Sequence, residues 1–143
     1  MPIPTVADAV ALAAKHHRDA LDKGGAPYIL HPLRVMMAMT TDRERRVAVL
    51  HDLLEDTEVT AENLRQLGYP EDEVTALEAL TRQKGETYEA FVERARINPL
   101  AAAVKRADLE DNMDVRRLSK IEPKDAERLA KYLRAWNRLR EHG

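Results

Sequence analysis

The sequence contains no cysteine, which excludes disulfide bonds, thiolate zinc sites and thiol nucleophiles. Glycine is scarce, with 5 among 143 residues, and aromatic residues make up only 4%. No apolar run approaches the roughly 20 residues that a membrane span needs, and the N-terminus lacks a signal-peptide pattern. The formal net charge of -2 argues against the broad basic field of nucleic-acid-binding proteins. We therefore expect a cytoplasmic protein that binds neither membranes nor nucleic acid.

Hydrophobic residues make up 44% of the sequence and charged residues 34%, a mix rich in alanine, leucine, arginine and glutamate. This composition favours helix over sheet. Apolar residues recur at helical spacing between turns marked by Gly and Pro, and no stretch shows a sustained period of two. The chain has no repeat or flexible linker and is long enough for one hydrophobic core. We therefore expect an all-α fold, with a single compact helical domain over residues 1–143.

Capping residues and prolines indicate where the helices begin. Thr5, Thr60 and Asn98 are suited to cap helix N-termini, and Gly68 is suited to end a helix. The pattern predicts helices over approximately residues 6–21, 32–39, 42–54, 60–67, 70–80, 88–95, 98–112 and 123–139.

The strongest chemical signal is a run of ionisable residues within residues 49–57. A helix advances about 100° per residue, so His51 and Glu55 lie one turn apart on one face. Asp52 and Asp56 have the same spacing on the adjacent face. Unpaired buried charge is costly, so such groups beside a core need partners or a metal. An imidazole with carboxylates suits Mn, Fe or Zn better than Ca or Mg.

Two further residues complete a candidate metal shell. His31 precedes Pro32 at the opening of a helix, and Asp108 shares a helix face with Lys105 and Asn112. Two histidines and two aspartates leave positions for water and a phosphate oxygen, and a bound metal lowers the pKa of water towards ~7. Taken alone, His51 and Asp52 could be a surface pair or a helix cap, and Asp108 could be a solvated helix acid. The three pieces together, in this order, favour metal binding.

Three motifs carry a resemblance to a known family. Residues 27–32 are PYILHP, residues 51–57 are HDLLEDT and residues 105–112 are KRADLEDN. Together they resemble the hydrolase domain of the RelA/SpoT family, in particular its small stand-alone SpoT-like members, over roughly residues 5–137. The resemblance implies an all-helical HD domain that uses Mn²⁺ or another divalent transition metal. It also implies an enzyme of the stringent response that removes the 3′-diphosphate of (p)ppGpp and releases pyrophosphate.

The resemblance assigns roles to individual residues. By position, the implied metal ligands are His31, His51, Asp52 and Asp108. The implied acidic pair, which orients and deprotonates the attacking water, is Glu55 and Asp56. The candidate substrate contacts are Arg18, Lys23, Lys84, Lys105, Asn112 and Tyr132. Residues 17–24, HRDALDKG, are less basic than the corresponding stretch of the family. Tyr132 also fits a core stripe, and Lys84 also fits a solvated loop.

The main prediction is therefore a guanosine 3′,5′-bis(diphosphate) 3′-pyrophosphohydrolase, with a phosphorylated nucleotide as its partner. One alternative is an HD hydrolase of another nucleotide, either a nucleoside monophosphatase or an NADPH phosphatase. Another is a nucleotide sensor without turnover, against which the presence of Glu55 and Asp56 argues. A metal-free helical scaffold would leave the histidines and aspartates unexplained. The sequence leaves open whether the protein is a homo-oligomer.

Overall fold

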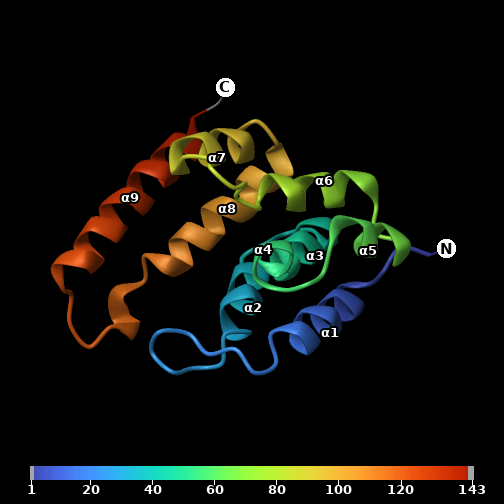
Figure 1. The fold of residues 1–143 in the computed structure, drawn as a ribbon, viewed down its shortest axis with the longest axis horizontal. Helices are drawn as coiled ribbons and strands as arrows, with labels where there is room; N and C mark the ends of the chain where they lie inside the picture. Colours follow the sequence, from blue (N-terminus) through green and yellow to red (C-terminus); the bar gives the residue numbers. More distant parts are fainter. Residues whose placement is uncertain (1, 142–143) are drawn as a thin grey trace.

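The computed structural model describes residues 2–141, and within that range the all-α prediction is confirmed (Figure 1). These residues form no strand, only an isolated antiparallel bridge between Leu21 and Pro27. None of their helices is long and apolar enough to cross a membrane. In chain order the elements are α1 (Val6–His16), α2 (Leu30–Met37), α3 (Asp42–Leu50), α4 (Leu53–Asp56), α5 (Ala61–Gln66), α6 (Glu71–Ala79), α7 (Tyr88–Arg96), α8 (Pro99–Asn112), the short 3-10 helix η1 (Val115–Arg117) and α9 (Pro123–Arg140).

Helices α3 and α8 form the centre of the bundle. Helix α3 packs against α1, α2, α6 and α8, and α8 also packs against α2, α6, α7 and α9. In Figure 1, α9 covers α8 on one side of the molecule and α1 lies on the opposite side. Five leucines from five different helices are fully buried in the core, namely Leu50, Leu53, Leu64, Leu77 and Leu109. Burying one leucine side chain contributes ~1.5–3 kcal/mol.

The predicted helix caps are confirmed. The side chains of Thr5, Thr60 and Asn98 each accept a backbone N–H from the first turn of the following helix. Each satisfies a donor that the helix itself leaves without a partner. Gly68 follows α5 with a φ of 96°, a left-handed conformation that glycine adopts without steric cost.

The first helix is shorter than predicted, because α1 ends at His16 and not near Leu21. A closed loop follows it, in which the Asp22 carboxylate accepts the backbone N–H groups of Gly24 and Ala26. These local bonds give the backbone an alternative to continued helix. The last predicted turn of the helix is therefore replaced by this loop.

The helix predicted over residues 42–54 is interrupted at His51 and Asp52, which lie between α3 and α4. Nδ1 of His51 lies 2.6 Å from the carbonyl oxygen of Ala48, which also accepts the His51 backbone N–H at 3.3 Å. In a continuous helix this oxygen would accept the backbone N–H of Asp52. The imidazole competes with that bond, which explains the interruption.

A buried ion pair joins α3 to α6. The Arg46 guanidinium donates to both carboxylate oxygens of Glu73, at 2.9 and 2.8 Å, and Glu73 is almost fully buried. Bidentate pairing satisfies a carboxylate that would be costly to bury alone. The pair therefore helps to fix α3, whose C-terminal end carries His51 and Asp52.

Candidate metal centre

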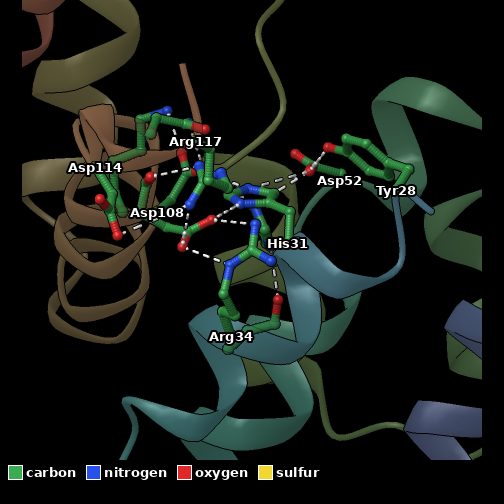
Figure 2. Close-up of polar contacts among 12 residues, drawn as sticks. Tyr28, His31, Arg34, Asp52, Asp108, Asp114 and Arg117 are labelled. Atoms are coloured by element: carbon green, nitrogen blue, oxygen red, sulfur yellow. Dashed lines mark hydrogen bonds and ion pairs between the residues drawn. The ribbon is translucent and has the colours of Figure 1, made fainter. Parts of the chain in front are cut away.

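The four residues predicted to bind metal come together where α2, α3, α4 and α8 meet. His31 lies in the first turn of α2, His51 and Asp52 follow α3, and Asp108 lies near the end of α8. His31, His51 and Asp108 are buried, and Asp52 is partly buried. Figure 2 shows His31 between Asp108 on one side and Asp52 and Tyr28 on the other.

Three of these residues form a compact group. One ligand atom from each of His31, His51 and Asp108 lies within 4.8 Å of the others. Oδ1 of Asp108 is 2.9 Å from Nε2 of His31 and 3.3 Å from Nε2 of His51. One carboxylate oxygen therefore faces two imidazole nitrogens, an arrangement that could hold one metal ion.

Asp52 lies beside this group. Its Oδ2 is 3.2 Å from Nε2 of His51 and 3.9 Å from Nε2 of His31. The Tyr28 hydroxyl donates to the same oxygen. Burial and then the Asp52 charge raise the pKa of Tyr28 above its ordinary value, so the hydroxyl keeps its proton. Tyr28 therefore orients Asp52, whose role as a fourth ligand stays a prediction.

The Nδ1 atoms of both histidines already have partners. Nδ1 of His51 lies 2.6 Å from the Ala48 carbonyl oxygen, and Nδ1 of His31 lies 2.6 Å from Oδ2 of Asp111. A carbonyl and an ionised carboxylate only accept hydrogen bonds, so each Nδ1 carries a proton. Both Nε2 atoms are then left to coordinate, and such partners are typical of metal-binding histidines. Two imidazoles with carboxylate oxygens fit a divalent transition metal.

Charged neighbours hold Asp108 in its ionised form. Nζ of Lys105 lies 2.9 Å from Oδ2, and the Asn112 amide donates to Oδ1. Burial opposes ionisation, but Lys105 and the two histidines hold the pKa of Asp108 well below its ordinary value. Burial likewise would lower the pKa of His51, but the Asp52 and Asp108 carboxylates raise it to about 9. The carboxylates of Asp52 and Asp108 therefore favour a positive charge at the point that the Nε2 atoms of His31 and His51 both face.

His31, Asp52 and Asp108 line a cleft of about 300 Å³. Nζ of Lys131 lies 4.5 Å from the ring centre of Tyr88 and 5.5 Å from that of Tyr132, so a cation and two rings share one wall. The mixture suits an anionic ligand that also carries rings. The other residues of the cleft are Asp22, Tyr28, Arg34, Glu55, Arg82, Phe91, Lys105, Asn112 and Arg117.

The structure places three of the six predicted substrate contacts in this cleft, namely Lys105, Asn112 and Tyr132. The other three are exposed and do not line it, namely Arg18, Lys23 and Lys84. The roles of all six in binding stay predictions.

Four cations of the cleft were missed by the sequence analysis: Arg34, Arg82, Arg117 and Lys131. Arg34 follows His31 by three residues, about one helical turn, and this spacing was a usable signal. The other three come from a loop, from η1 and from α9, and only the tertiary structure brings them together.

The loop between α6 and α7 is held in place by Arg94. Its guanidinium contacts the Glu86 carboxylate at 2.6 and 2.8 Å and donates to the Thr81 carbonyl at 2.8 Å. Arg82 in turn donates from Nε to the Glu86 carbonyl. The backbone N–H of Arg82 donates to Oε1 of Glu55 at 2.9 Å. This loop therefore positions a predicted catalytic acid.

The two acids of the predicted pair have different surroundings on α4. Glu55 lines the cleft, whereas Asp56 is not among the residues of its walls. Partial burial, followed by the charges of Asp52 and Glu55, raises the pKa of Asp56 to about 6. Glu55 is therefore placed to touch a ligand, and Asp56 titrates close to neutral pH.

The raised pKa of Asp56 predicts a pH-dependent effect on stability. The folded protein holds this proton up to about pH 6, whereas the unfolded chain loses it near its ordinary value of 3.8, so ionised Asp56 destabilises the fold above pH 6. In metal-free protein, Asp56→Asn should raise the free energy of unfolding at about pH 7.5 by up to ~1 kcal/mol, allowing for solvent screening. The gain should shrink towards about pH 4.5. Urea unfolding measures both values, and equal stability of the two proteins at the higher pH would contradict the expectation.

No protein-family model matches the chain. In sequence it is similar to the guanosine-3′,5′-bis(diphosphate) 3′-pyrophosphohydrolase of Aquifex aeolicus (strain VF5), with 29% identity over 117 residues, covering 73% of this chain and 17% of that protein. It is also similar to a probable GTP pyrophosphokinase of Mycobacterium leprae (strain TN), with 32% identity over 117 residues, covering 73% of this chain and 15% of that protein. The chain thus spans less than a fifth of the length of either relative.

In structure the chain is similar to a metazoan ortholog of SpoT, which is described as hydrolysing ppGpp and playing a role in starvation responses. The TM-score is 0.78 with 21% sequence identity, and the match covers 98% of this chain and 89% of the other. The shared fold therefore extends over nearly the whole chain. The resemblance predicted from the three motifs is confirmed, since the chain is similar in sequence to a guanosine-3′,5′-bis(diphosphate) 3′-pyrophosphohydrolase and in fold to an ortholog of SpoT.

Proposed function

We propose that the protein is a metal-dependent hydrolase that removes the 3′-pyrophosphate of guanosine 3′,5′-bis(diphosphate). The observation that carries the proposal is the convergence of the His31 and His51 Nε2 atoms on Asp108, beside a cleft that contains Glu55 and several cations. The names of a sequence relative and of a structural neighbour support the same substrate. We propose Mn²⁺ as the metal and Asp52 as its fourth ligand.

The side chains around the cleft can provide the acid–base steps of such a reaction. When bound, a divalent metal would supply Lewis acidity and a water of lowered pKa. Glu55, held by the backbone N–H of Arg82, can orient that water and take its proton. Asp56 follows Glu55 on α4 outside the cleft walls, and with a pKa of about 6 it can hold a proton or release it near that pH.

The cleft walls support a substrate with several phosphate groups and a ring system. Arg82, Arg117 and Lys131 bring positive charge to the cleft from three different elements. Charge-assisted hydrogen bonds to phosphate are among the strongest in proteins. The rings of Tyr88 and Tyr132, both close to Lys131, offer apolar surface for a ribose or a base. These features favour a phosphorylated nucleotide over a smaller phosphate ester.

A substrate panel tests the proposal. Mn²⁺-loaded protein is incubated separately with guanosine 3′,5′-bis(diphosphate), also called guanosine tetraphosphate, with NADPH and with a nucleoside monophosphate. Release of phosphate or pyrophosphate is followed in each reaction. We expect pyrophosphate and GDP from guanosine tetraphosphate at the highest rate. Much faster cleavage of NADPH or the monophosphate would overturn the choice of substrate but leave the metal chemistry in place. Binding of guanosine tetraphosphate without turnover of any of the three would instead indicate a sensor.

A further inference from the structure

The His31 imidazole is held at both of its nitrogens by one helix. Oδ1 of Asp108 lies 2.9 Å from Nε2, and Oδ2 of Asp111 lies 2.6 Å from Nδ1. The two aspartates are three residues apart on α8, a spacing that places them on neighbouring positions of one helix face. Of these two aspartates, only Asp108 belongs to the candidate metal-binding group. Asp111 contacts His31 but is not itself one of the candidate metal ligands.

Two arginines hold Asp111 in place. Arg34 donates from Nε to Oδ1 at 2.7 Å and from Nη2 to Oδ2 at 3.1 Å. Arg117 lies 3.4 Å from Oδ1 through Nη1 and donates from Nη2 to the Asp111 backbone carbonyl at 2.8 Å. Figure 2 shows both arginines close to His31. The Asp111 side chain is only 11% exposed, and a carboxylate so buried would be costly without such partners.

We propose that Asp111 is a positioning residue of the metal centre, because it accepts the His31 Nδ1–H and so keeps the Nε2 lone pair directed at the metal. The inference rests on the metal centre of the proposed function. A neutral imidazole protonated on Nδ1 presents its lone pair on Nε2. Without Asp111 the ring can rotate or take the other tautomer, and either change removes a preformed ligand.

The test measures Mn²⁺ affinity by calorimetric titration of the full chain. Loss of a hydrogen-bond partner of this kind lowers metal affinity by about 10–100-fold, and we expect a loss on this scale for Asp111→Ala. The matched control is Asp114→Ala, which removes a neighbouring acid that pairs with Arg116 and Arg117 instead of His31. The control should bind Mn²⁺ as the unchanged protein does. Equal affinity of Asp111→Ala and the unchanged protein would overturn the inference, as would an equal loss in the control.

A second variant separates positioning from a merely structural ion pair. Asp111→Asn keeps an oxygen that can accept the His31 Nδ1–H but loses the charge that pairs with Arg34 and Arg117. Positioning predicts that this variant binds Mn²⁺ more tightly than Asp111→Ala, whereas an ion-pair role alone predicts the same loss in both.

A third experiment uses the unchanged protein, so its result does not depend on whether a variant folds. In Zn²⁺-loaded protein, nuclear magnetic resonance should show the His31 imidazole protonated on Nδ1, and protonation on Nε2 would overturn the inference. If the unchanged protein binds neither Mn²⁺ nor Zn²⁺, the metal centre of the proposed function fails, and that result differs from a failure confined to the Asp111 variants.

Discussion

Replacing His51 by alanine is expected to remove stoichiometric Mn²⁺ from the purified protein and, with the metal, most of its turnover. Nε2 of His51 lies 3.2 Å from Asp52 and 3.3 Å from Asp108, so its loss removes a nitrogen that faces both acids at close range. A metal contributes several kcal/mol of transition-state stabilisation, which corresponds to a loss of at least ~10³-fold in turnover. Elemental analysis measures the metal, and pyrophosphate release measures the rate. Asp52→Ala should also lose the metal.

The matched control for this prediction is His16→Ala. His16 lies at the end of α1, 3.2 Å from Glu58, and does not line the cleft. We expect this variant to keep both its metal and its activity. Full metal retention in both His51→Ala and Asp52→Ala would show that the metal is held elsewhere.

Changing Glu55 to glutamine is expected to leave the metal bound and to lower turnover by ~10²–10⁴, the range for a positioned general acid or base. The glutamine keeps the size of the side chain and can still accept the backbone N–H of Arg82, but it cannot take a proton from water. The loss should appear in kcat, because Glu55 accepts the proton only in the transition state and not in the bound ground state. Steady-state kinetics with Mn²⁺-loaded protein separate kcat from KM.

Glu58→Gln provides the control for Glu55→Gln. The Glu58 side chain is 81% exposed and lies beside His16, so the same chemical change there should leave kcat unaltered. A near-normal rate for Glu55→Gln, together with a large loss for Asp56→Asn, would assign the proton transfer to Asp56.

Much of the helical framework could be predicted because its signals are local. Caps at Thr5, Thr60 and Asn98 depend on a hydrogen bond within one turn, so the residue type alone carries the information. The interruption at His51 was not predictable in the same way. It depends on the imidazole turning back to the Ala48 carbonyl, a choice that helical periodicity does not reveal.

The candidate site shows the same division between local and distant signals. Three short motifs indicated the group formed by His31, His51 and Asp108, because each motif combines the ligand with distinctive neighbours. Asp111 was part of one of these motifs, but its contact with His31 joins residues 80 positions apart in the chain. Arg82 and Lys131 likewise reach the cleft from separate elements. Such contacts depend on how the helices pack, which a single sequence does not specify residue by residue.

A metal titration with turnover as the readout tests the metal centre most directly. Protein stripped with a chelator is titrated with Mn²⁺ while pyrophosphate release from guanosine tetraphosphate is followed. A single metal site formed by His31, His51, Asp52 and Asp108 predicts no release at the start and a rate that saturates at one Mn²⁺ per chain. Full turnover without a divalent metal, or a rate that saturates only well above one Mn²⁺ per chain, would contradict it.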